Sequence, residues 1–325
     1  MKFQPSRRSA LLALILPLVP LVGQAAGFPD KPLRMIVPFP AGGAADLMAR
    51  LLAQHLGEQL GQQVVIDNRG GAGGVLASEM VARAPADGYT LLFATMGTHA
   101  INASLYEQLR YDPQKDFAPV ALTHITPRVL VVGPSVKARS VAELVALAKA
   151  RPGQISYGSA GNGSSSHLSG ALFESLAGVD MVHVPYKGSA ALLTDLLAGR
   201  IDTTFDSYAV YEEYIRSGRV QALAVTSRSR MGALPQVPTL AESGLAGYEV
   251  SNWLGLLAPA GTSREVIGAL HAAVIRAMGD VAMRRQLIAL GIEPVTSTPQ
   301  EFSALIRSEI PKWARIVKMT GARVE

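Results

Sequence analysis

The residues with the clearest chemical meaning form a small uncharged turn at positions 41–43, with the sequence AGG. The turn follows a short apolar run that ends at Phe39 and precedes apolar residues at helical spacing from Ala44 onward. A helix that begins here directs unpaired N–H groups and the positive end of its dipole out of the turn. Because Asp46 is the one acid, base or nucleophile nearby, the turn predicts binding of a carboxylate or phosphate rather than reaction with it.

A second turn of this kind occupies residues 156–166, with the sequence SYGSAGNGSSS. It offers backbone donors, hydroxyl groups and serines that can cap the next helix, but no charge. Two such turns could hold an anion from both sides of a cleft, although tight strand-to-helix links also need glycine for their backbone alone. We expect a reversible site of neutral donors and helix dipoles, because an arginine clamp would bind more permanently.

Motifs for other chemistries are incomplete. No glycine cluster completes GxxxxGK[ST] or GxGxxG, which argues against nucleotide binding. The GxSxG pattern of hydrolases also fails, so a serine nucleophile at Ser159 or Ser166 with His167 as base stays an alternative that no motif supports. The chain has no cysteine and its six histidines form no HExxH pair, so we expect neither a metal nor a cofactor.

Further polar residues follow predicted strands and should lie on the same edge as the two turns. Tyr186 and Lys187 come between a strand and a helix, where Lys187 either adds positive charge to the site or faces solvent. Asp206 ends another strand and would suit an ammonium or hydroxyl group of a ligand, or cap the next helix. His99 and His167 also follow turns, where capping or buried hydrogen bonding is favoured over ligand contact. Packing at the hinge is favoured for Trp253.

The elements that position these residues form two α/β units. In the first unit strands alternate with helices, and the turns after its strands should meet on one rim, where parallel sheets bind ligands. The alternation restarts in a second unit. Expected strands are residues 33–39, 63–66, 89–94, 155–157, 181–184, 201–205 and 221–225, and expected helices begin at 44 or span 75–84, 101–109, 141–150, 165–177, 190–197 and 210–216.

Two long apolar segments, 120–132 and 248–257, are predicted to cross between the units and to act as a hinge. Three helical patterns follow at 263–278, 281–290 and 299–320, without a strand between them, so we assign them to the first unit. The predicted organisation is a discontinuous first domain of residues 26–125 and 250–325, with residues 126–249 as the second domain.

The chain begins with a basic segment, an apolar run of about a dozen residues and small residues, which is typical of a cleaved secretory signal peptide at residues 1–25. The run is too short for a membrane anchor, which needs about 20 residues. Removal of this segment takes away three of the 30 basic residues and none of the 25 acidic ones. The remaining surface charge is mixed and has no basic tract, which argues against nucleic-acid binding.

Several motifs together resemble the Bug proteins, the extracytoplasmic solute receptors of tripartite tricarboxylate transporters. These motifs are VPFPAGGAADLMAR, DNRGGAGG, YGSAGNGSSSHLSGALF, VPYKGSAALLTDLLAGRID and GLLAPAGT, in the order of the family. The resemblance implies a two-domain Venus-flytrap fold of the periplasmic binding protein type II class, which binds a small dicarboxylate, tricarboxylate, amino acid or aromatic acid. It also implies integral-membrane transporter subunits as partners, and we expect a monomer without enzymatic activity.

The resemblance also assigns ligand contacts. It implies that the first loop holds a carboxylate through main-chain groups and bridging water, at Phe39, Ala41, Gly42, Gly43, Ala44 and Asp46. It places a second set near the ligand: Asn68, Gly73, Thr95, Ser159, Asn162, His167, Tyr186, Lys187 and Asp206. Departures from the family pattern are Ala44, where proline is common, and the segment DNRGGAGG, where the family has DNRPGAGG and Gly71 stands in place of its proline-glycine step. The run from Tyr208 to Glu213, which contains Tyr211 and Glu212, is also atypical and is expected to help select the ligand.

The sequence therefore predicts a periplasmic solute receptor that captures a carboxylate at Gly42 and Gly43 and closes the turn from Ser159 to Asn162 onto it. A sensory receptor that passes its closed form to a membrane kinase is the main alternative from another functional class. The sequence does not separate these two roles.

Overall fold

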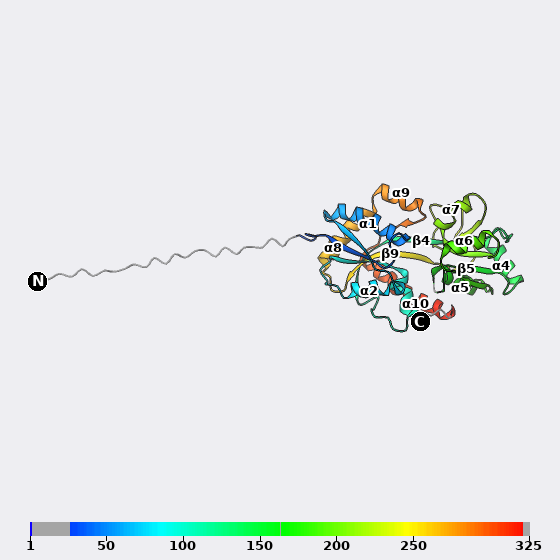
Figure 1. The fold of residues 1–325 in the computed structure, drawn as a ribbon, viewed down its shortest axis with the longest axis horizontal. Coiled ribbons are helices and arrows are strands. Elements are labelled where there is room, and N and C mark those ends of the chain that lie inside the picture. Colours follow the sequence, from blue (N-terminus) through cyan, green and yellow to red (C-terminus); the bar gives the residue numbers. More distant parts are fainter. Residues whose placement is uncertain (2–26, 163, 321–325) are drawn as a thin grey trace.

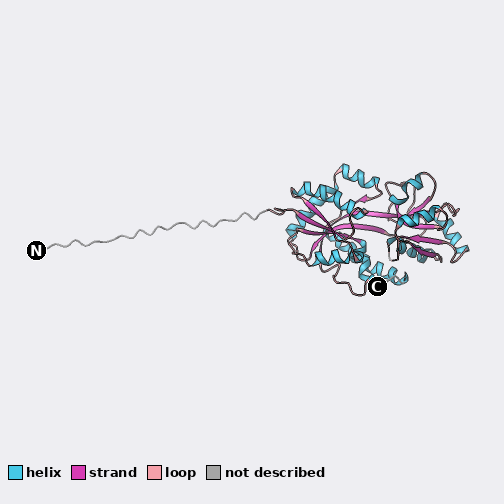
Figure 2. Ribbon diagram, in the orientation of Figure 1, coloured by secondary structure: helices cyan, strands magenta, loops and turns pink. Residues whose placement is uncertain are grey.

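The computed structural model describes Met1, residues 27–162 and residues 164–320. Apart from Met1, the predicted signal peptide lies outside the described residues. Within the described part, two α/β units lie side by side and strands run through the middle of both, with helices around them (Figures 1 and 2). The two-unit α/β fold predicted from the sequence is confirmed.

The first unit is built on the parallel strands β1 (Leu33–Val37), β2 (Val64–Asn68) and β3 (Thr90–Thr95), in the order β2-β1-β3. Strand β9 (Ser251–Pro259) continues this sheet antiparallel to β3. The apolar side chains of β1 are fully buried because elements cover both faces of the sheet. Its helices are α1 (Ala44–Leu60), α2 (Val75–Ala82), α3 (Asn102–Leu105), α8 (Arg264–Met278) and α9 (Val281–Ala289), with the short turns η1 (Ala72–Gly74) and η2 (Gly97–Ile101).

The second unit contains β5 (Ser156–Ser159), β6 (Val182–Pro185) and β7 (Thr203–Ser207), which are parallel in the order β7-β5-β6. Strand β8 (Gln221–Val225) pairs beside them with β4. Helices α4 and α5 begin at serine caps, because the side chains of Ser140 and Ser164 accept N–H groups of the first turn. The helices of this unit are α4 (Val141–Ala150), α5 (Ser165–Ala177), α6 (Ser189–Leu197) and α7 (Tyr208–Arg216).

Strand β4 (Phe117–Val132) joins the two units, as Figure 1 shows. Its residues up to Pro127 pair with β9, and from Arg128 onward they pair with β7, while β8 joins from Val129. The second crossing lies just before β9, where Val250 donates its N–H to the carbonyl of Thr226 in the second unit. Both predicted crossing segments are therefore confirmed.

The last part of the chain differs from the prediction in one element. A two-residue strand, β10 (Glu293–Pro294), lies between α9 and α10 (Pro299–Thr320) and pairs antiparallel with His124 and Ile125, so the expectation of no strand there is wrong. Helix α10 packs against α3 and β4 and also against α5 of the second unit.

The helix predicted at 101–109 is displaced in the structure. The helical segment there begins with η2 at Gly97 and ends with α3 at Leu105.

Among the described residues, no single helix is long and apolar enough to span a membrane. Helices α8 and α9 pass that test only as a pair that is bent by 69°.

Candidate ligand-binding site

A cleft of about 1070 Å³ opens between the two units. The first unit contributes residues 39–45 of the first loop, the second unit contributes residues around Ala160 to Ser165, and the crossing strands contribute Thr126, Pro127 and Asn252. This volume is at the upper end of the range of sites for small organic ligands. The two glycine-rich turns predicted to hold an anion therefore line the same space.

The first loop is shaped by residues that lie behind it. Gly42 has a positive φ of +83°, and its N–H donates to Oδ2 of Asp46 at 2.9 Å. The side-chain amide of Asn68 donates to the carbonyl of Phe39 at 3.1 Å and to Oδ1 of Asp46 at 3.0 Å. The Arg50 guanidinium, followed by the Gly42 N–H, lowers the pKa of Asp46 to about 2. Asp46 and Asn68 thus fix the loop without lining the cleft.

Helix N-termini converge on the cleft from both units. The N-cap of α1 is Gly43, and no side chain caps this helix, so its first N–H groups have no partner within the helix. Ser207, the N-cap of α7, and Ala209 line the cleft from the second unit, again without a side-chain cap. Ser165, the first residue of α5, lines it as well. Each of these ends carries partial positive charge.

The second turn is held by its own serines. Oγ of Ser159 lies 2.7 Å from Nε2 of His183 and also bonds to both backbone groups of Gly161. Ser159 is fully buried and does not line the cleft, and the ring of His167 stacks on His183 at 3.8 Å rather than facing Ser159. The Ser159–His167 arrangement of the hydrolase alternative is therefore not formed. Burial, with a contribution from His167, lowers the pKa of His183 to about 4.

The structure divides the predicted site residues into two groups. Those that line the cleft are Phe39, Ala41, Gly42, Gly43, Ala44, Gly73, Thr95 and Asn162. Those that lie outside its lining are Asp46, Asn68, Ser159, His167, Tyr186, Lys187 and Asp206.

The predicted residues outside the cleft lining either contact other side chains or are exposed to solvent. The Tyr186 hydroxyl donates to Asp195 at 2.8 Å, and Lys187 is exposed. Asp206 is buried and forms an ion pair with Arg128. Tyr186 and Asp206 therefore hold other side chains, as Asp46, Asn68 and Ser159 do.

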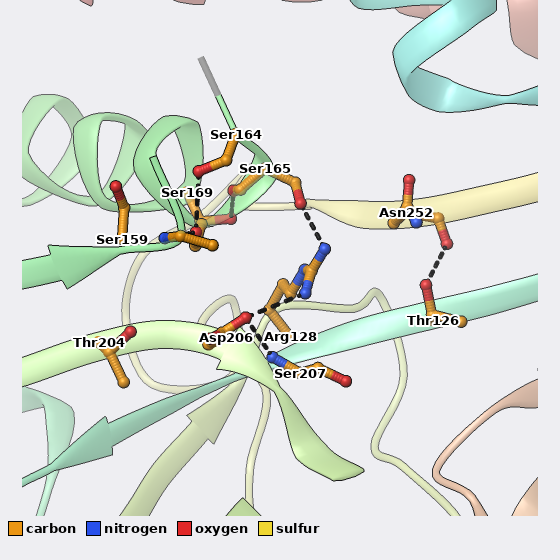
Figure 3. A network of polar contacts seen from close by, with 12 residues as sticks. Thr126, Arg128, Ser159, Ser164, Ser165, Ser169, Thr204, Asp206, Ser207 and Asn252 are labelled. Carbon is orange, nitrogen blue, oxygen red and sulfur yellow. Dashed lines mark hydrogen bonds and ion pairs between the residues drawn. The ribbon is translucent and has the colours of Figure 1, made fainter. Parts of the chain in front are cut away.

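Sequence reasoning missed Arg128, which is the one charged side chain among the described residues that line the cleft. Its Nη1 lies 3.2 Å from Oδ1 of Asp206 and its Nη2 donates to the hydroxyl of Ser165 (Figure 3). Burial lowers the pKa of the Arg128 guanidinium and the Asp206 carboxylate opposes this shift, so the group stays charged. The expectation of a site without arginine is wrong. One feature of the sequence did point to this residue, because Arg128 is a charged residue within the apolar crossing segment 120–132.

Of the run from Tyr208 to Glu213, which is expected to help select the ligand, Ala209 lines the cleft and the other residues lie outside its lining. The side chain of Tyr211 is fully buried in the core, and Glu212 and Glu213 are exposed. Tyr208 packs against Gly291 of the first unit, where an added Cβ would lie 2.5 Å from Cδ1 of Tyr208. This run therefore contributes Ala209 to the cleft and a contact between the units at Tyr208.

Trp253 is buried and packs edge to face against Phe302 with ring centroids 5.5 Å apart, so the packing role predicted for it is confirmed. Within the described ranges, no group of three or more histidine, aspartate or glutamate side chains is placed to hold a metal ion.

Comparison with known proteins agrees with this architecture. The sequence model of the family described as "Tripartite tricarboxylate transporter family receptor" matches residues 48–322, which is most of the chain. The solved structure "R. palustris Rpa4515 with adipate" is 39% identical, covers 90% of this chain and 98% of its own, and superposes with a TM-score of 0.76.

Two further solved structures are similar over nearly the whole chain. "MatC (Rpa3494) from Rhodopseudomonas palustris with bound malate" is 34% identical, covers 89% of this chain and 100% of its own, and has a TM-score of 0.73. The periplasmic binding protein BugD is 35% identical, covers 92% of this chain and 100% of its own, and has a TM-score of 0.73. This chain belongs to the tripartite tricarboxylate transporter family receptors, the Bug-type solute-binding proteins, and has their two-unit periplasmic binding protein fold.

Proposed function

We propose that this protein captures a small organic carboxylate in the periplasm and delivers it to the integral subunits of a tripartite tricarboxylate-type transporter. The observation that carries this proposal is the uncapped N-terminus of α1, which opens at Gly43 into a cleft shared by both units. Unpaired N–H groups at such an end bind carboxylates well. The α5 and α7 ends and Arg128 add positive potential, and no acidic side chain lies among the described lining residues.

The proposed mechanism is closure of two lobes around the ligand. The lobes correspond to residues 26–125 with 250–325, and to residues 126–249. One carboxylate of the ligand binds at the turn of Gly42 and Gly43, held in shape by Asp46 and Asn68. Closure then brings the turn around Asn162 onto the other side of the ligand, with bending where β4 passes from one sheet to the other.

The ligand class is inferred from the chemistry of the cleft and from relatives. Rpa4515 was solved with adipate and MatC with malate, and both ligands are dicarboxylates. A site of helix ends and neutral donors, with a single arginine, suits a compact organic anion that must also be released. We expect the exported, monomeric protein to bind one such anion per chain.

A thermal-shift panel tests this function on the protein purified from the periplasm. Adipate, malate, citrate, glutamate and benzoate are compared with dimethyl adipate, which has the size of adipate but no charge. A ligand at 100 times its dissociation constant stabilises the folded state by about 2.7 kcal/mol, which raises Tm by about 4 °C for a chain of about 300 residues. Uptake of the best ligand, labelled, should fall when the gene is deleted.

The proposal is wrong if none of the five anions raises Tm, or if dimethyl adipate raises it as much as adipate. Turnover of a p-nitrophenyl ester, abolished by Ser159→Ala, would support the hydrolase alternative instead.

A further inference from the structure

Arg128 occupies a special position in the cleft. It lies where β4 leaves the first sheet and enters the second, directly after Pro127. Its side chain is 17% exposed, and that of Asp206 is only 2% exposed. Asp206 does not line the cleft, so the guanidinium lies between a buried carboxylate and the open space. Figure 3 shows it directed toward Asp206 and Ser165.

The hydrogen bonding of this pair is incomplete within the described part of the chain. A guanidinium has five N–H donors, and the two contacts of Arg128 are those of Nη1 with Asp206 and of Nη2 with Ser165. Nε of Arg128 and Oδ2 of Asp206 are buried and have no hydrogen-bond partner. Unpaired donors on a charged group are costly when water is excluded. Nη1 and Nη2 each carry two N–H groups and each makes one of these contacts, so the guanidinium has two further donors for a ligand.

Two helix ends of the second unit lie beside the guanidinium. Ser165 begins α5, and Ser207, whose N–H donates to Oδ1 of Asp206 at 2.8 Å, is the N-cap of α7. Both residues line the cleft together with Arg128. The positive ends of two helices and a guanidinium thus meet at one corner, and a carboxylate there would be opposed by one buried acid, Asp206.

We propose that Arg128, Ser165 and Ser207 form a second anion subsite, so that the ligand is a dicarboxylate with one carboxylate at each unit. This inference rests on the proposed function, because the other carboxylate occupies the α1 end at Gly43. Asp206 acts as a positioning residue that holds the guanidinium from behind. A dicarboxylate then links the two units through charge, whereas a monocarboxylate engages the first unit alone.

The test compares each dicarboxylate with its own monomethyl ester, which keeps the size and loses one charge. The α,ω-diacids from succinate to suberate and their monomethyl esters are titrated by calorimetry into the wild-type protein. A charge-assisted hydrogen bond contributes about 10- to 150-fold in affinity. We therefore expect the best diacid to bind about 10- to 150-fold more tightly than its monoester.

The decisive variant is Arg128→Met combined with Asp206→Asn. It removes both charges together, so no unpaired charge is left buried. Its ratio of monoester to diacid dissociation constants should fall to about 1–3, with monoester affinity within about threefold of wild type. The matched control is Arg83→Met with Glu79→Gln, which removes one ion pair of the first unit away from the cleft lining and should keep the wild-type ratio.

Arg128→Lys adds a finer test, because it keeps the charge but loses the planar fork. Its ratio should lie between those of the wild type and the double variant.

Three results would overturn the inference. One is tight binding of monoesters by the wild-type protein, with a ratio of monoester to diacid dissociation constants near 1. This result would leave the proposed function intact. Another is a double variant that weakens diacid and monoester equally, which makes Arg128 a structural residue. Absence of binding by every carboxylate would reject the proposed function as well.

Discussion

Replacing Gly42 with alanine should weaken ligand binding more than it lowers stability, because the exposed first loop can relax when it is empty. A Cβ built on Gly42 meets no atom within 4 Å, so the change introduces backbone strain at φ +83° without a clash. Left-handed backbone costs a non-glycine residue about 1–2 kcal/mol. The stiffer unfolded chain offsets about 0.4–1 kcal/mol of this cost in the folding equilibrium.

Gly61 provides the matched control for this variant. It lies at the C-terminal end of the same helix, α1, with φ +66° and again no atom within 4 Å of an added Cβ. Because Gly61 does not line the cleft, Gly61→Ala should lower stability by about 1 kcal/mol, or Tm by about 1–2 °C, with unchanged affinity. In Gly42→Ala the ligand must bring the relaxed loop back to its strained conformation, at a cost of about 1–2 kcal/mol. This cost predicts that the variant binds the ligand about 5- to 30-fold more weakly than the wild type does.

Calorimetric titration of both variants with the tightest carboxylate of the panel, together with their Tm values, measures these two effects. The reasoning fails if Gly42→Ala binds within twofold of wild type. It also fails if Gly61→Ala loses as much affinity as Gly42→Ala does.

Three further predictions concern stability and closure. Asp46→Asn should lower the free energy of unfolding by about 1–3 kcal/mol at pH 6. The difference should shrink as the pH falls below about 4 and disappear only below about pH 2, because the folded-state pKa of Asp46 is about 2 and its carboxylate keeps the stabilising charge above that pH. Burial lowers the pKa of His99 and His124 to about 3, so the unfolded chain binds their protons first, and stability should fall by about 1.4 kcal/mol per histidine per pH unit from about pH 6.5 downward. Equal urea midpoints at pH 7 and pH 5 would contradict this. Gly291→Val should push against Tyr208 and hold the units apart, so that carboxylate affinity falls at least fivefold, and a variant with wild-type affinity would show that this contact does not control closure.

Regular elements with strong local signals were predictable. Helices α4 and α5 have the predicted bounds, because each starts at a serine N-cap and continues with apolar residues at helical spacing. The crossing strand β4 was predictable because an apolar run of that length does not suit a loop. These features depend on residues close together in the chain.

The missed features depend on contacts that residue periodicity does not show, and two of them join residues far apart in the sequence. The position of η2 follows from mutual hydrogen bonds between Thr95 and Thr98, which no periodicity reveals. Strand β10 has two residues and exists through its pairing with β4. The role of Arg128 depends on Asp206, 78 residues later, so its presence in the cleft could not be read from neighbouring residues.

Helix α10 restricts the movement of the two units relative to each other, because it packs against both. It has 22 residues and contacts both units, and Phe302 and Trp313 belong to the same apolar cluster as Tyr157 and Phe173 of the second unit. Separating the lobes without bending α10 would expose this cluster to water. Pro311 lies inside the helix and lacks the N–H that would complete the backbone bond there, so it is the weakest point for flexure. We therefore expect the proposed closure of the two lobes to reach only as far as this one helix can bend at Pro311.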